Sequence, residues 1–295
     1  MLQIRLLLNV TGIYIINKKE AIHKVIRGNE KAESMKDIWK ETKVSEGELS
    51  KVRIGPLGIW IKRIHDEWDV AVKRIDESDD EADSYYESRL AETVVDALEW
   101  QRWAAGDDEG VFKIEPVMPD RPVVVRPETS FSILPSRSAL MYVSVPVFVR
   151  ILIGKSRSFL CEQPTVVLSN TWFGEPTSGE LCYSLFTRAR RNVLKEQARP
   201  HRAVCPVRIE NVSSEQLAFT RLCLRVGHLS IFRGENQLWT NEVKVIFESS
   251  DGASRINYVE GAPKIDEAGE MLGNPRIPLT KGIIESGLRN LRIFG

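Results

Sequence analysis

The stretch that decides the fold is KVRIGPLGIWIKRIHDEWDVAVK, residues 51–73. Apolar side chains recur at every second position along it, and turn-forming residues interrupt the alternation at Gly55-Pro56 and at His65-Asp66-Glu67. A period of two residues is typical of a strand with one face against a core. The stretch therefore predicts a hairpin with alternating faces, which continues past the second turn.

Short apolar runs separated by turn signals continue along most of the chain, and the prolines between residues 116 and 127 exclude a long helix there. Many short strands at such spacing are typical of an all-β sandwich or barrel. We expect a mainly β fold, with antiparallel β-sandwich or barrel-like sheets, short helices and, as one arrangement, two β subdomains. The further runs expected as strands are 100–104, 111–114, 123–125, 141–145, 146–153, 204–209, 217–226, 229–232 and 238–247.

Two pairs of these runs predict further hairpins. Residues 100–104 and 111–114 flank a Gly- and Asp-rich turn, and residues 204–209 and 217–226 flank a polar turn. The second strand of the latter pair changes parity, because Leu217 and Phe219 are odd positions whereas Leu222 and Leu224 are even. Within one sheet this requires an extra residue, so we expect a bulge near Thr220–Arg221.

Two segments have helical spacing instead. Tyr86, Leu90, Val94 and Leu98 predict a short amphipathic helix, and Ile284, Leu288 and Leu291 predict another in the tail. The expected organisation is an extension over 1–34 (a start-site artefact or an ordinary extra strand and helix), a hairpin-rich subdomain with an acidic insertion over 35–115, a main β-sandwich domain over 116–250, and a linker with an amphipathic tail over 251–295.

The chain has 295 residues and no net charge, with 41 basic and 41 acidic residues. A neutral chain lacks the overall attraction to nucleic acid or anionic membrane that basic proteins show. The charges are unevenly placed, however: acidic residues crowd positions 76–83, and basic residues crowd positions 188–208. The four cysteines are not closely spaced and no secretion signal accompanies them, so we expect reduced thiols and a cytoplasmic location.

The strongest candidate for a functional segment is residues 169–191. A polar loop with an aromatic pair runs into a strand that ends in arginines, and such loops carry much of the binding chemistry of rigid scaffolds. Guanidinium groups suit phosphate, carboxylate or an acidic protein segment. The predicted docking residues are Trp172, Phe173, Glu180, Arg188, Arg190 and Arg191.

Other interpretations of the same arginines stay open. They could pair with the acidic run 76–83, within the chain or across a homo-oligomer, which agrees with the zero net charge. They could also bind phosphate or single-stranded nucleic acid beside the aromatic residues. The lack of an overall basic character argues against nucleic acid as the partner.

The sequence evidence for a metal site or a catalytic site is weaker. His201, Cys205, Cys223 and His228 are the candidate metal ligands, but their spacing matches no common ligand motif, and Cys205 shares a strand face with apolar residues. A small-molecule enzyme that uses Cys182 as nucleophile, with His201 or His228 as base, is the alternative from another class. No motif of a serine hydrolase, phosphate-binding loop or zinc protease is present, and the sequence implies no cofactor.

Several blocks of the chain resemble an uncharacterised archaeal and bacterial family with a domain of unknown function. They are Ile54 to Trp60, Pro119-Asp120-Arg121-Pro122, Ser169 to Gly174, Gly179 to Tyr183, and Leu238-Trp239-Thr240-Asn241. The resemblance covers about residues 35–247, and Met35 to Trp39 is similar to the opening of such proteins. It implies no activity, and it implies a membrane channel as one candidate partner. The sequence thus favours a non-catalytic binding or regulatory protein with an unidentified protein partner.

Overall fold

The computed structural model describes residues 38–74, 84–88, 98–106, 109–127, 129–189, 199–248, 254–278 and 285–288, with the side chains of 84–88, 186–189 and 285–288 left aside. Nearly all regular structure in these residues is β, as predicted; the exception is a 3₁₀ turn at Val226–His228. No helix in them is long and apolar enough to cross a membrane.

Residues 51–73, with their period of two, form the centre of one sheet. Strands β2 (Leu49–Ile54), β3 (Leu57–Ile64) and β4 (Glu67–Arg74) pair antiparallel around the two predicted turns. Strands β5 (Ser84–Ser88) and β6 (Trp100–Ala104) complete the sheet in the order β5-β2-β3-β4-β6. The prediction of this hairpin is confirmed.

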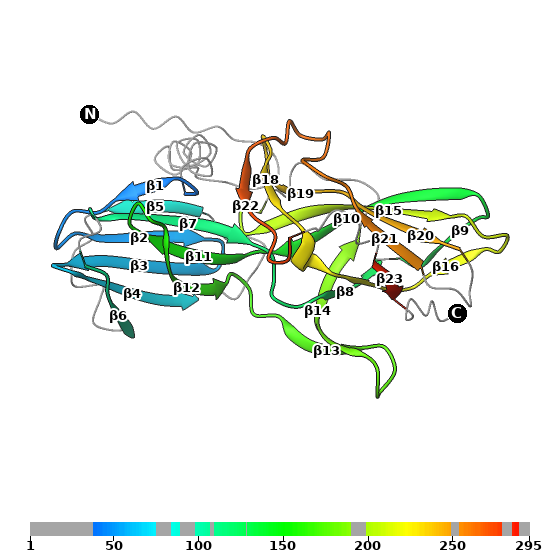
Figure 1. Ribbon diagram of the computed structural model, residues 1–295, viewed down its shortest axis with the longest axis horizontal. Coiled ribbons are helices and arrows are strands. Elements are labelled where there is room, and N and C mark those ends of the chain that lie inside the picture. The colour runs from blue at the N-terminus through cyan, green and yellow to red at the C-terminus, as the bar shows by residue number, and fades with distance from the viewer. Residues whose placement is uncertain are drawn as a thin grey trace, which may run out of the picture.

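A second sheet covers this one. It consists of β1 (Glu41–Lys43), β7 (Val111–Val117), β11 (Phe148–Ile153) and β12 (Ser158–Pro164), and Figure 1 shows the two sheets stacked at one end of the molecule. Trp68 of the first sheet meets Phe112 of the second edge-on, with ring centroids 6.4 Å apart. The two inner faces thus form a β-sandwich, with the aromatic rings in its core.

The other end of the molecule is built on two long paired strands, β10 (Arg137–Pro146) and β15 (Arg202–Asn211). The sheet around β15 runs in the order β22-β18-β19-β15-β20-β21-β23, and β10 pairs with β15 beside that path. The further strands are β18 (Ile231–Arg233), β19 (Leu238–Thr240), β20 (Val243–Phe247), β21 (Ser254–Tyr258), β22 (Met271–Gly273) and β23 (Glu285–Leu288).

A smaller sheet in the order β13-β14-β8-β17 carries the predicted docking segment. Its strands are β13 (Ser169–Phe173), β14 (Glu180–Ala189), β8 (Val123–Pro127) and β17 (Leu222–Leu224). A two-stranded ladder joins β16 (Leu217–Phe219) to β9 (Phe131–Ile133). Most pairs are antiparallel, but β14 runs parallel to β8, and β15 runs parallel to both β19 and β20.

Strands β18 and β19 overlap two of the runs expected as strands, and they pair around a turn at Gly234–Gln237. In contrast, β6 pairs with β4 and β7 pairs with β1 and β11, so strands 100–104 and 111–117 lie in different sheets. The prediction of a hairpin there is wrong, because each strand finds a better partner elsewhere in the chain than across its own turn.

The predicted hairpin of residues 204–226 is also wrong, and so is its bulge. Strand β16 pairs with β9, whereas β17 pairs with β8 in another sheet. The change of parity between Phe219 and Leu222 therefore marks the place where the chain leaves one sheet and enters the next. A strand that changes sheets reverses which side chains face the core without an inserted residue.

In each segment predicted as a helix, the described residues include a strand. Tyr86 lies in β5, opposite Val52 of β2, and Leu288 lies in β23, opposite Ser254 of β21. The residues between 89 and 97 and those after 288, as well as the acidic run 76–83, lie outside the described residues. At Tyr86 and Leu288, pairing with an available sheet edge outweighs the helical spacing of a few apolar residues.

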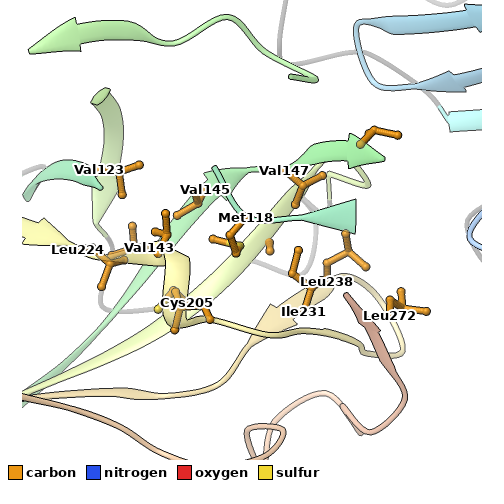
Figure 2. Packing of buried hydrophobic residues seen from close by; sticks show 14 of the residues in the cluster. Met118, Val123, Val143, Val145, Val147, Cys205, Leu224, Ile231, Leu238 and Leu272 are labelled. Carbon is orange, nitrogen blue, oxygen red and sulfur yellow. The ribbon is translucent and has the colours of Figure 1, made fainter. Parts of the chain in front are cut away.

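One hydrophobic core extends through both ends of the molecule. Ile59 and Ile151 of the sandwich and Val207 and Val245 of the second end belong to a single continuous cluster. Figure 2 shows part of it, where Cys205 lies among valine and leucine side chains from several strands. The chain crosses between the ends more than once, and one crossing is at Val147, directly between β10 and β11.

Candidate functional site

The predicted docking segment forms the hairpin of β13 and β14, which extends away from the body of the molecule (Figure 1). Strand β13 is at the edge of its sheet, and its register places Trp172 opposite Leu181 and Phe173 opposite Glu180. Successive residues of a strand point to opposite faces. The hairpin therefore has one face with Trp172 and Leu181, and another with Phe173 and Glu180.

The turn of this hairpin is tightly built around one carbonyl. The backbone oxygen of Glu175 accepts hydrogen bonds from the backbone N–H groups of Ser178 and Gly179, at 3.3 Å and 2.8 Å. It also accepts one from Nε1 of Trp172 at 3.0 Å. A Cβ atom at Gly179 would lie 2.4 Å from that indole nitrogen, so only glycine fits beneath the ring. The turn thus fixes the orientation of Trp172.

Trp172 remains half exposed in spite of this anchoring, at 50% of its full accessible surface, and Leu181 opposite it is 44% exposed. On the same face, Arg121 lies over the ring of Tyr183 at 5.3 Å and donates a hydrogen bond to Asn170. We call Trp172, Leu181, Tyr183 and Arg121 the hairpin surface. It combines exposed apolar area with one cation on a fixed backbone.

Phe173 has a different position from the one expected. It is buried (3% exposed) and packs with Val124, Cys182 and Cys223 on the opposite face of the sheet. The guanidinium of Arg221 covers its ring at 5.2 Å. Phe173 therefore supports the hairpin from beneath and presents no stacking surface to a partner.

Glu180 begins β14 beside the two buried thiols. Its Oε1 accepts a hydrogen bond from Arg225 at 3.0 Å and lies 3.7 Å from the Cys223 sulfur. The sulfurs of Cys182 and Cys223 are also 3.7 Å apart. We call Glu180, Cys182 and Cys223 the thiol cluster. Its cysteines come from segments 41 residues apart in the chain, so nothing local in the sequence joins them.

The pKa values of the two thiols are shifted in opposite directions. A hydrogen bond from Cys223 lowers the pKa of Cys182, although burial opposes this effect. The same hydrogen bond, together with burial, raises the pKa of Cys223. Of the two thiols, Cys182 is thus the more easily ionised.

The predicted arginines are only partly within the described residues. Arg188 lies in β14, where its backbone is opposite Arg126 of β8, and its side chain is not described. Arg190 and Arg191 lie outside the described residues. The arginines that the structure does place at the hairpin are Arg121, Arg221 and Arg225, which the sequence analysis missed. The alternation Arg221-Leu222-Cys223-Leu224-Arg225 was the available signal.

The four candidate metal ligands predicted from the sequence do not converge among the described residues. Nδ1 of His228 donates a hydrogen bond to the Ile277 carbonyl at 3.1 Å, and the His228 ring lies 5.0 Å from that of Tyr258. His201 is fully buried against Gly55, and Cys205 is buried in the main core. Cys223 is close to Cys182 and Glu180 instead. This group is the one set of three ligating side chains found together in the described part of the chain.

All four thiols should react slowly with iodoacetamide at neutral pH. Cys182, Cys205 and Cys223 are buried, and burial raises the pKa of Cys161 from 9.0 to about 11 and that of Cys205 to about 12. A rise of two units leaves roughly 100-fold less thiolate at Cys161 than in a thiol of ordinary pKa. Peptide mapping after timed labelling measures each rate. Fast labelling of Cys182 alone would support the alternative of a cysteine nucleophile.

Comparisons with known proteins give one result. No curated protein and no solved structure matches the chain. A family model described as "Protein of unknown function (DUF432)" matches residues 38–289. The match confirms the resemblance to an uncharacterised family and extends it beyond residue 247, the end expected from the sequence.

Proposed function

Because the chain belongs to the DUF432 family of proteins of unknown function, we propose its function from the site itself: it is a non-catalytic binding protein that docks a protein partner through the hairpin surface. The proposal retains Trp172 from the sequence analysis, replaces Phe173 with Leu181, and adds Arg121. Regulation of the bound partner is the simplest outcome of such docking.

The observation that supports this function is a tryptophan that is both exposed and fixed. The side chain of Trp172 is hydrogen bonded to its own turn, so little rotamer entropy is left to lose when a partner covers it. Tryptophan and arginine are the residues that most often dominate the binding energy of protein interfaces. Leu181 extends the apolar area beside the indole.

The partner that best fits this surface carries an apolar side chain flanked by carboxylates. Arg121 lies on the hairpin surface, and Arg188 lies near the far end of β14, followed in the sequence by Arg190 and Arg191. Leu181 and Arg188 are seven positions apart, which is at most about 23 Å along an extended strand, and the register shift between Leu185 and Arg188 shortens this. This length is within one protein interface of ordinary size, which buries about 800 Å² on each partner.

The double variant Trp172→Ala/Leu181→Ser should lose the partner. Removal of a central tryptophan costs about 2 kcal/mol or more of binding energy, which is about 30-fold in affinity. The measurement is quantitative mass spectrometry of proteins that co-purify with the tagged full-length chain from native cells. We expect the same partner to be depleted by Arg188→Ala/Arg190→Ala/Arg191→Ala, with an almost unchanged melting temperature.

Phe159→Ala supplies the matched control for this experiment. Phe159 is 63% exposed, but it lies in β12 of the sandwich at the other end of the molecule (Figure 1). The Phe159→Ala protein should still co-purify with the partner. Equal recovery of the partner with the hairpin variant and with the control variant would exclude the hairpin surface as the docking site. Loss of the fold in the arginine variant would show that those side chains are structural.

The cellular setting forms part of the proposal. All four cysteines are free thiols, which is typical of proteins in a reducing compartment, and this supports a cytoplasmic location. A membrane channel remains one candidate partner, and it would appear as an integral membrane protein in the co-purified fraction. A second copy of the chain is another candidate, which sedimentation at several concentrations would reveal.

A further inference from the structure

Three side chains of the kinds that bind metal ions converge on the face of the hairpin sheet opposite to the hairpin surface. The sulfurs of Cys182 and Cys223 are 3.7 Å apart, and the Cys223 sulfur is 3.7 Å from Oε1 of Glu180. All three donor atoms lie within 4.8 Å of one another. Both cysteines are buried, whereas Glu180 is only partly buried, so the thiol cluster has one side open toward solvent.

Two of these separations, from sulfur to sulfur and from the Cys223 sulfur to Oε1 of Glu180, are close to the edges of a tetrahedral zinc site. Zinc–sulfur bonds of about 2.3 Å at the tetrahedral angle place two sulfurs about 3.8 Å apart. A zinc–oxygen bond of about 2.0 Å in the same geometry places sulfur and oxygen about 3.5 Å apart. The thiol cluster is therefore arranged for an ion at its centre with little movement of the side chains.

We propose that Cys182, Cys223 and Glu180 bind a single Zn²⁺ ion, with water in the fourth position. Two thiolates select a thiophilic ion over Mg²⁺ or Ca²⁺, which prefer oxygen ligands. On binding, each thiol releases its proton to solvent and donates its sulfur lone pair to the metal. No electron is transferred, so no oxidant or reductant is needed.

Arg225 fits the surroundings of such a site. Its guanidinium donates a hydrogen bond to Oε1 of Glu180 at 3.0 Å, as partners of metal-binding carboxylates commonly do. Two thiolates and one carboxylate around Zn²⁺ leave one net negative charge. Arg225 is placed to balance that charge and to hold the carboxylate in position.

A disulfide is the other product that two neighbouring cysteines could form, and the sheet argues against it. Cys182 lies in β14 and Cys223 in β17, with β8 between them. Strands on either side of a third strand are roughly 9–10 Å apart. A disulfide requires Cα atoms about 4.4–6.8 Å apart, so the backbone would have to move. A metal ion bridges the longer gap because it adds two bonds between the sulfurs.

The bound ion would have a structural consequence. It would join β14 to β17 across β8 and would brace the hairpin close to its turn. Because the folded chain holds the three ligands together, the ion should bind it more tightly than the unfolded chain and so raise the melting temperature. This inference is independent of the proposed docking function, since neither Trp172 nor Leu181 belongs to the thiol cluster.

The test is a titration of the reduced, metal-free full-length protein with Co²⁺, followed by displacement with Zn²⁺. We expect one equivalent of Co²⁺ to give the intense visible bands of a tetrahedral site and a sulfur-to-metal charge-transfer band. Zn²⁺ should abolish both and raise the melting temperature. Cys182→Ser and Cys223→Ser should each weaken Co²⁺ binding by about 100-fold or more. Cys161→Ser, in a different sheet, should bind as the wild type does.

Three outcomes would overturn the proposal. These are no spectral change with Co²⁺, pale bands typical of an octahedral site, and equal binding by all the cysteine variants. Mass loss of two hydrogens under mild oxidant, without metal binding by the reduced protein, would identify a redox pair instead. If a serine variant fails to fold, protection of Cys182 and Cys223 from alkylation by added Zn²⁺ in the wild-type protein answers the same question. Partner capture enters none of these measurements.

Discussion

Replacement of Gly55 with alanine is expected to destabilise the protein by about 2–5 kcal/mol. Gly55 has a φ of +58°, a left-handed conformation that costs an L-residue about 1–2 kcal/mol. Its added Cβ would also lie 2.2 Å from Nδ1 and 2.9 Å from Cβ of His201. Overpacking of this kind typically costs about another 1–3 kcal/mol. For a chain of this size, the melting temperature should fall by roughly 5–15 °C.

The effect should be large because His201 cannot move aside. Its side chain is fully buried, and its carbonyl accepts hydrogen bonds from Val147 N–H at 2.9 Å and from the Thr165 hydroxyl at 3.3 Å. Val147 is one of the places at which the chain crosses between the two ends of the molecule. The turn of the sandwich hairpin is thus pressed against the junction with the second end.

Two comparisons separate the clash from the backbone strain. Gly47 has a φ of +75°, and a Cβ atom added there would have nothing within 4 Å, so Gly47→Ala should show the strain alone. Gly55→Ala combined with His201→Ala should recover part of the loss relative to the sum of the single variants. Chemical denaturation of the four variant proteins and the wild type measures the coupling. Strict additivity would show that the two residues are not in contact.

Removal of the carboxylate of Asp266 should cost about 2–4 kcal/mol. The carboxylate accepts hydrogen bonds from Nε1 of Trp239 at 2.9 Å, from the backbone of Asn236 at 3.1 Å and from the Asn236 side chain. Trp239 is almost fully buried, so Asp266→Ala would leave its indole N–H without this acceptor. The Gly234–Gln237 turn between β18 and β19 would lose its support as well.

Asp266→Asn is the matched control. Asp266 has a φ of +55°, a conformation that asparagine tolerates and alanine does not. The asparagine amide oxygen can still accept from Trp239, so we expect a smaller loss than with alanine. Guanidinium unfolding at pH 7 compares the three proteins. Equal stability of the wild type and Asp266→Ala would show that the turn is supported without the carboxylate.

The contribution of the Asp266 carboxylate to the stability of the fold should also depend on pH. Burial alone would raise the pKa of this carboxyl, but hydrogen bonds from Trp239 and Asn236 outweigh it and hold the pKa below the usual value. A depressed pKa in the folded state gives stability that is fully present above the unfolded pKa of about 3.9 and is lost as pH falls through the folded value. The difference between wild type and Asp266→Asn should therefore be constant from about pH 5 to 7 and shrink below about pH 4.

The sequence predicted only part of the candidate site. Composition located this segment and its exposed tryptophan, because polar turns and aromatic residues are local features, but the residues expected as a loop form strand β13. Whether Trp172 or Phe173 faced solvent could not be predicted, since that depends on which face of the sheet meets other strands. The approach of Cys182 to Cys223 was hidden for the same reason, because β8 brings together strands that are remote in the chain.

By itself the sequence determined that this protein is mainly β, and it located the strands whose alternation is strong, as in residues 51–73. Alternation and turns act over a few residues, so they specify strands and the hairpins whose strands have no better partner. Only the tertiary structure decided that β6 and β7 separate into different sheets, and that β16 and β17 do so too. Strand pairing is chosen by the burial of whole faces against distant segments, and no local pattern records that choice.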